Sequence, residues 1–219
     1  MRYLSWAAFY EGGTDALYLD VLLPRILRDL IANEGTDLVE VPEAPAVRLG
    51  QNGRSIEAIA AEACSFTDAF DVVFIHADTG GRGVERNLDS RSQAYCRAMQ
   101  EICNWPEDQC VTITPRHETE AWLLADPYAV ISAFGYSGAP EEVGLPLNAR
   151  VAERLVDPKA TLKDAAERIS GRRRKQAIEN TFPAIGQRQD LNVLRNSQSF
   201  ADFENRLRSC LLSLRLISQ

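Results

Sequence analysis

Three short segments of the sequence place carboxylates beside glycine or histidine. They are residues 11–15 (EGGTD), 76–81 (HADTGG) and 117–120 (HETE). The first two close apolar runs and the third follows one, so the polar side chains are expected at an edge or a cleft rather than inside the core. Carboxylates that converge repel one another unless a cation neutralises them, and Mg²⁺ is the natural candidate. The glycines would let a phosphate group approach the backbone closely.

Five residues of these segments are the candidate site. We expect Glu11 and Asp78 to hold a divalent metal ion, Mg²⁺ or Mn²⁺, with His76 as a third possible ligand. Glu120, and Glu118 with it, would complete the site or position a water molecule. The metal would polarise a phosphate and lower the pKa of the attacking water, and Glu11 could alternatively act as the general base.

Each of these residues also has an ordinary structural interpretation. EGGTD is a common helix entry, in which Thr14 or Asp15 would be the N-cap. Asp78 would then be a turn residue and His76 a hydrogen-bonded histidine at a strand end. The carboxylates of HETE would favour a helix N-terminus through the helix dipole. HETE lacks the second histidine of HExxH, which excludes a zinc protease of that kind.

The elements that must position these residues alternate between strand and helix patterns. Such alternation predicts an α/β fold, a mostly parallel, Rossmann-like sheet flanked by helices. In such a sheet, ligands collect at the carboxyl ends of the strands, where all three segments would lie. The expected strands are residues 3–10, 37–41, 71–76 and 110–114, and the expected helices begin at residue 14, with a kink or restart at Pro24, and span 54–67 and 87–103.

The C-terminal part of the chain differs in composition and charge. Residues 1–135 hold 10 Lys/Arg and 21 Asp/Glu, a balance of −11, whereas residues 136–219 hold 14 and 10, a balance of +4. We therefore divide the chain into a core, 1–135, and a mostly helical extension, 136–219, packed on that core. The clearest helix of the extension has Ser199 as its expected N-cap and an apolar stripe typical of packing surface.

Basic residues of the extension are candidates for contacts with nucleic acid. They are Lys159 and the run Arg172, Arg173, Arg174 and Lys175. Arginine and lysine neutralise backbone phosphates, which makes a basic segment a candidate binding surface. The alternative is that the run is a solvated helix face.

Composition also bears on location. No apolar run is long enough to span a bilayer, and the start MRYLSWAAFYEGG is too short and too soon acidic for a signal peptide. We expect a cytoplasmic protein without a membrane partner. The five cysteines form no CxxC pair, and we interpret them as reduced, mostly buried side chains.

The order of these parts resembles the Toprim domain of topoisomerases, primases and overcoming-lysogenization-defect (OLD) nucleases. In that family a glutamate after the first strand and a DxD pair after a later strand bind magnesium for phosphodiester chemistry. Glu11 matches the glutamate, and Asp78 matches the second acid of the pair. His76 replaces the first acid, so either it is not a direct ligand or the site prefers a softer metal such as Mn²⁺.

A closer resemblance is to a small Toprim-like family of bacterial proteins, and it spans nearly the whole chain. The matching segments are the EGGTD opening and residues 118–126 (ETEAWLLAD), 157–162 (DPKATL) and 199–203 (SFADF). The resemblance implies metal-dependent nuclease activity and an association with an ATPase partner in defence against phage.

Three functions remain open on the sequence. The first is a divalent-metal-dependent nuclease or a related phosphodiester-cleaving enzyme, with nucleic acid as its partner. The second is a non-catalytic, Toprim-like binding subunit of a larger complex, suggested by the missing acid and the acidic surface. The third is a hydrolase of small phosphate esters, which needs the same cation and shares the same residues.

Overall fold

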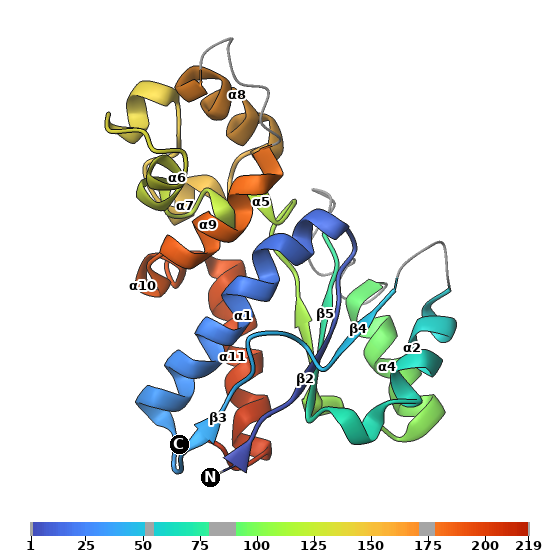
Figure 1. Ribbon diagram of the computed structural model, residues 1–219. Coiled ribbons are helices and arrows are strands. Elements are labelled where there is room, and N and C mark those ends of the chain that lie inside the picture. Colours follow the sequence, from blue (N-terminus) through green and yellow to red (C-terminus); the bar gives the residue numbers. More distant parts are fainter. Residues whose placement is uncertain (1, 51–54, 79–90, 171–177, 219) are drawn as a thin grey trace.

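The computed structural model describes residues 2–50, 55–78, 91–170 and 178–218 (Figure 1). In this part of the chain a four-stranded parallel sheet is flanked by helices, which confirms the predicted α/β class. The strand order is β4-β2-β5-β6, and β1 and β3 form a separate parallel pair. The strands are β1 Arg2–Tyr3, β2 Trp6–Phe9, β3 Val39–Glu40, β4 Val47–Leu49, β5 Val72–His76 and β6 Cys110–Ile113.

The N-terminal strands differ from the prediction in three places. The strand expected over 3–10 is interrupted at Ser5, whose backbone N–H and hydroxyl both donate to Asp71 Oδ2, at 2.8 and 3.0 Å. Between the expected strand 37–41 and the expected helix 54–67, where no strand is predicted, the chain forms β4, which pairs with β2. The predicted strand 37–41 is shorter than expected and pairs with β1, outside the main sheet.

The two faces of the sheet are buried under different sets of helices. Alternate residues of β2 and β5 point to opposite sides: Trp6 and Phe74 belong to one apolar cluster, and Ala7 and Ile75 to the other. Helices α2 (Ile56–Cys64) and α4 (Gln93–Cys103) cover the second face. The long helix α1 (Gly13–Glu34) and the last helix α11 (Gln198–Ser213) cover the first (Figure 1).

Helix α1 begins earlier than the sequence suggested and is continuous. Its N-cap is Gly12, so neither Thr14 nor Asp15 is the cap. Asp15 is the third residue of the helix, and its Oδ2 accepts the Gly12 N–H at 2.8 Å. Pro24 lies inside the helix, which neither ends nor restarts there. As a result, the Asp15 side chain points back toward Gly12 and the end of β2.

Four of the five cysteines are paired, and the interpretation of all five as reduced is therefore wrong. One disulfide, Cys64–Cys103, joins α2 to the end of α4, and the other, Cys96–Cys110, joins α4 to the start of β6. The paired cysteines are 39 and 14 residues apart in the sequence. The pairing depends on how the helices pack, and no short cysteine motif in the sequence indicates it. Cys210 in α11 is a free, buried thiol, as expected.

Beyond residue 135 the described residues form helices and contribute no strand to either sheet, as expected. Helix α11 begins after Ser197, whose Oγ accepts the Phe200 N–H; the predicted N-cap, Ser199, instead accepts a hydrogen bond from Trp122 Nε1 at 2.8 Å. No described helix is both long and apolar enough to cross a membrane. The helices after β6 are α5 Glu120–Leu123, α6 Pro127–Ala133, α7 Ala149–Ala152, α8 Pro158–Ser170, α9 Phe182–Arg188, α10 Leu191–Leu194 and α11.

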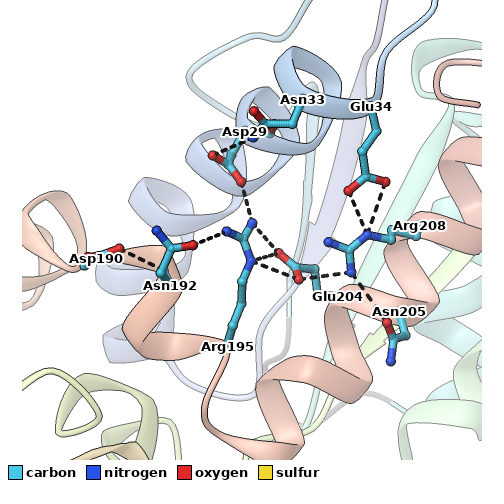
Figure 2. A network of polar contacts seen from close by, with 9 residues as sticks. All are labelled: Asp29, Asn33, Glu34, Asp190, Asn192, Arg195, Glu204, Asn205 and Arg208. Atoms are coloured by element: carbon cyan, nitrogen blue, oxygen red, sulfur yellow. Dashed lines mark hydrogen bonds and ion pairs between the residues drawn. The ribbon is translucent and has the colours of Figure 1, made fainter.

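A group of charged side chains, here called the arginine–carboxylate network, connects α1 to the C-terminal helices (Figure 2). Arg195, at the end of α10, donates to Glu204 of α11 at 2.8–3.1 Å and forms an ion pair with Asp29 of α1. Arg208 pairs with Glu204 and with Glu34, at 3.1 and 3.0 Å. The network shows how the helical extension is attached to the helix that follows β2.

Candidate metal centre

The three acid-bearing segments meet at the carboxyl ends of neighbouring strands. Glu11 lies between β2 and α1, His76 is the last residue of β5, and residues 117–119 lie between β6 and α5, which begins at Glu120. Because β5 pairs in parallel with both β2 and β6, these strand ends lie at one edge of the sheet. The local sequence thus determines the position of each residue, and the parallel topology brings them together.

Asp15, His76 and Asp78 form a group that could hold a metal ion. One ligand atom from each lies within 4.8 Å of the others. His76 Nε2 is 3.2 Å from Asp78 Oδ1, and Nδ1 is 3.7 Å from Asp15 Oδ2. The two short distances involve opposite nitrogens of the imidazole, and only one of them can bind a given ion. Ligands of one Mg²⁺ at about 2.1 Å would be roughly 3–4 Å apart, so the side chains would have to move closer together to hold one ion. We call these three residues the metal triad.

Thr119 holds two members of the triad in place. Its backbone N–H donates to Asp78 Oδ1 at 3.1 Å, and its Oγ1 is 3.0 Å from His76 Nε2. His76 and Thr119 are both fully buried, so these contacts replace the water that the side chains would otherwise bind. Outer partners of this kind orient metal ligands.

The environment of His76 is strongly electronegative. Burial alone would lower the pKa of the imidazole, but the hydrogen bond to Asp78 and the charges of Asp15, Asp78 and Glu11 outweigh it, and the pKa is raised. The pKa of Asp15 is also raised, in this case because burial disfavours the charged carboxylate. The triad therefore attracts a positive charge, which a proton on His76 or a metal ion can supply.

Glu11 lies beside the triad but is already occupied by protein partners. Its Oε2 accepts the Asp78 N–H at 2.9 Å, and its Oε1 forms an ion pair with Arg91. Arg91 also donates to the Asp78 carbonyl at 3.1 Å. The structure thus brings the two predicted ligands, Glu11 and Asp78, next to each other, while the ligand group contains Asp15 instead of Glu11.

Glu118 and Glu120 form a second pair of acids near Asp78. Burial raises the pKa of Glu120 to about 7, and the charges of Glu118 and Asp78 add to this shift. Burial and the Asp78 charge also raise the pKa of Glu118, one of whose carboxylate oxygens is buried and has no hydrogen-bond partner in the described part of the chain. A carboxylate that titrates near neutral pH can exchange protons with water or substrate.

The predicted nucleic-acid contacts divide into two groups. Lys159, on the first turn of α8, is exposed, and its charge lowers the pKa of both Glu118 and Glu120, which places it near the acid pair. The run Arg172, Arg173, Arg174 and Lys175 lies outside the described residues.

Sequence reasoning missed Asp15 as a candidate ligand. From the sequence alone, Asp15 is a candidate helix cap because it follows two glycines and a threonine. The signal that could have found it is the start of the helix: with Gly12 as N-cap, position 15 is the third helical residue, whose side chain points back toward the cap. The helix start is hard to predict because Gly12 has no side chain that could identify it as the N-cap.

The fold and the site together define an α/β protein with a group of possible metal ligands at the carboxyl edge of a parallel sheet. Residues 10–208 match the family model described as a domain of unknown function, DUF4276. Because the match covers most of the chain, the protein belongs to this family. No curated protein and no solved structure matches the chain.

Proposed function

We propose that the protein is a divalent-metal-dependent enzyme that cleaves phosphodiesters, a nuclease of the Toprim type. The observation that carries this proposal is the metal triad, two carboxylates and a buried histidine, at the carboxyl edge of a parallel sheet. Further acids surround it, while Arg91 is paired with Glu11 and Lys159 lies near the acid pair. Such an excess of negative charge at one site favours a bound cation.

The residues present suit a metal ion of intermediate softness. Two carboxylates are ligands that Mg²⁺ prefers, while an imidazole ligand shifts the preference toward Mn²⁺. When bound, the ion would supply polarisation of a phosphate and a lower pKa of a coordinated water. We therefore propose Mn²⁺ or Mg²⁺ as the cofactor.

The side chains around the triad would supply the remaining steps. Glu120, with its pKa of about 7, would accept the proton of the attacking water at neutral pH. Glu118 would position that water, and Lys159, exposed beside the acid pair, would contact the substrate phosphate. Glu11 would hold Arg91 and the Asp78 backbone in place rather than bind the metal.

Cleavage assays would test the proposal. Purified protein is incubated with plasmid, single-stranded DNA, RNA and p-nitrophenyl phosphate in Mg²⁺, Mn²⁺ or EDTA. We expect metal-dependent cleavage of a nucleic acid, reduced at least about 100-fold by Asp78→Asn, which removes a ligand charge at nearly constant shape. Asp37→Asn, at an exposed position, is the matched control. Cleavage that continues in EDTA or in Asp78→Asn would refute the proposal, and cleavage of the small ester alone would favour a phosphate-ester hydrolase.

One observation favours a second candidate, a non-catalytic binding subunit. Both oxygens of Glu11 have protein partners, Arg91 and the Asp78 N–H, so the residue expected as a ligand or base is occupied. A subunit of this kind would bind Mn²⁺ but leave every substrate intact, also when combined with an ATPase partner. That partner and a role in phage defence are parts of the proposal that rest on the family resemblance, whereas the cytoplasmic location is a proposal that rests on the composition of the sequence.

A further inference from the structure

A basic hollow of about 390 Å³ lies where the helical extension meets the segment before α5. We call it the arginine hollow. Its lining includes Arg116 from the loop after β6, Arg150 on α7, Arg154 just beyond α7, and Arg195 and Gln198 at the junction of α10 and α11. Arginines from three separate parts of the chain thus face one space.

Among the described residues, three of the four arginines have no counter-charge. Arg195 is neutralised by Asp29 and Glu204 in the arginine–carboxylate network. Arg116, Arg150 and Arg154 are exposed, and in the described ranges none of their side chains has a hydrogen bond or ion pair. Unpaired guanidinium groups that share a hollow repel one another, and an anion would relieve that repulsion.

Glu153, the carboxylate that the described residues contribute to the lining, does not neutralise these arginines. Glu153 is buried, with 6% of its surface exposed, and accepts the backbone N–H groups of Gln198 and Ser199 at 2.8 and 2.7 Å. Although burial alone would raise its pKa, hydrogen bonds from Ser199, Ser197 and Gln198 outweigh it, and the pKa is lowered. The negative charge of Glu153 is thus directed to the N-terminus of α11.

The arginine hollow is adjacent to the candidate metal centre. Arg116 precedes Glu118 by two residues, and two residues span at most about 7 Å. Helix α7, which carries Arg150, packs against α5, whose first residue is Glu120. A short segment therefore connects Arg116 to the acid pair, and the contact of α7 with α5 brings Arg150 near it.

We propose that the arginine hollow binds a backbone phosphate of a nucleic-acid strand, close in the strand to the phosphate cleaved at the metal triad. This inference rests on the proposed function, whose substrate contacts it specifies. The guanidinium group suits this role because its planar fork of donors matches phosphate oxygens in a bidentate manner. Three such groups, which have no side-chain partner in the described part of the chain, are suited to a diester phosphate, while the nearby acids are suited to the cation.

Strand binding can be tested without cleavage. Fluorescence anisotropy of a labelled single-stranded oligonucleotide is measured in EDTA at several salt concentrations, for wild type and for Arg150→Gln/Arg154→Gln. We expect the double variant to bind at least about tenfold more weakly. The slope of log affinity against log salt should fall in magnitude by about 0.7, because the hollow binds one phosphate and each lost phosphate contact contributes about 0.7 for a single strand.

Two controls make the result specific to the hollow. Lys163→Gln/Arg215→Gln removes the same charge at exposed positions that do not line it, and it should bind like wild type. Circular dichroism and thermal unfolding of all variants show that the fold is retained. Equal weakening in both double variants, or no binding by wild type, would overturn the inference.

Two further measurements separate this inference from its alternatives. If inorganic phosphate binds wild type as tightly as the oligonucleotide does, the hollow is a site for a small phosphate and the strand proposal is wrong. A protein that binds the strand through these arginines but never cleaves it would refute the proposed function while supporting the hollow. Conversely, cleavage with an unchanged KM in Arg150→Gln/Arg154→Gln would overturn the hollow alone.

Discussion

Two groups of charged side chains in this molecule differ in how their charges are balanced. In the arginine–carboxylate network, Arg195 and Arg208 face Asp29, Glu34 and Glu204, and each carboxylate has an arginine partner (Figure 2). At the candidate metal centre, the triad has carboxylates on both sides of one histidine, and the acid pair adds two more beside Asp78. There, Arg91 is paired with Glu11, not with the triad.

The comparison distinguishes a structural use of buried charge from a functional one. A paired and hydrogen-bonded group holds helices together, and the network joins α1 to α11 in this way. An unbalanced group costs stability because burial and like charges both disfavour ionisation, as the raised pKa values of Asp15, Glu118 and Glu120 show. Such a cost is expected where a ligand supplies the missing charge.

The largest expected effect is on stability, at the network. Arg195→Ala leaves Glu204, whose side chain is 3% exposed, with one arginine partner instead of two. We expect a loss of about 3 kcal/mol in the free energy of unfolding, because an incompletely paired buried charge is costly. Urea denaturation followed by circular dichroism would measure it. A change below about 0.5 kcal/mol would mean that the network contributes no more to stability than ordinary surface ion pairs do.

A somewhat smaller effect should appear at the triad, and only when metal is added. Mn²⁺ at 100 times its Kd should stabilise wild type by about 2.7 kcal/mol, because the ion binds the folded state. Asp15→Asn, which removes a ligand charge at nearly constant shape, should lose this stabilisation, while Arg195→Ala should keep it. In EDTA, Asp15→Asn should be at least as stable as wild type. Equal metal stabilisation in Asp15→Asn would show that the ion binds elsewhere.

The extent to which the sequence predicts these regions depends on the range of the interactions. The convergence of Glu11, His76 and Asp78 was predictable because parallel strands end at one edge and each residue directly follows an apolar run. Asp15 was not predicted, because its orientation depends on where α1 begins, and that position is a glycine.

Features that depend on tertiary packing were beyond the sequence pattern. The disulfides join residues 39 and 14 positions apart, and their cysteines meet only because α4 packs against α2 and β6. The arginine hollow likewise combines Arg116 with Arg150 and Arg154, which no local spacing connects. By contrast, the α/β class follows from local alternation of strand and helix patterns, and the structure confirms it.

The smallest expected effect is on the pH dependence of stability. It tests whether Glu118 and Glu120, like the carboxylates of the metal triad, are at least partly buried acids whose charges are not balanced. Burial raises the pKa of Glu120 to about 7 in the folded state, above its ordinary value of 4.5, so the folded protein binds this proton more tightly than the unfolded chain. The stability associated with the bound proton is fully present below about pH 4.5 and is lost as the pH rises through about 7. With allowance for solvent screening, we expect a loss of about 2 kcal/mol over that range in EDTA.

Glu120→Gln isolates this contribution, because the other acids titrate in both proteins and largely cancel in the difference. The free energy of unfolding of wild type relative to the variant should decrease between about pH 4.5 and 7 and be constant above. A difference that is flat across this range would mean that Glu120 is solvated like a surface carboxylate. The acid pair would then resemble neither the balanced network nor the triad, and Glu120 would lose its assignment as the group that accepts a proton at neutral pH.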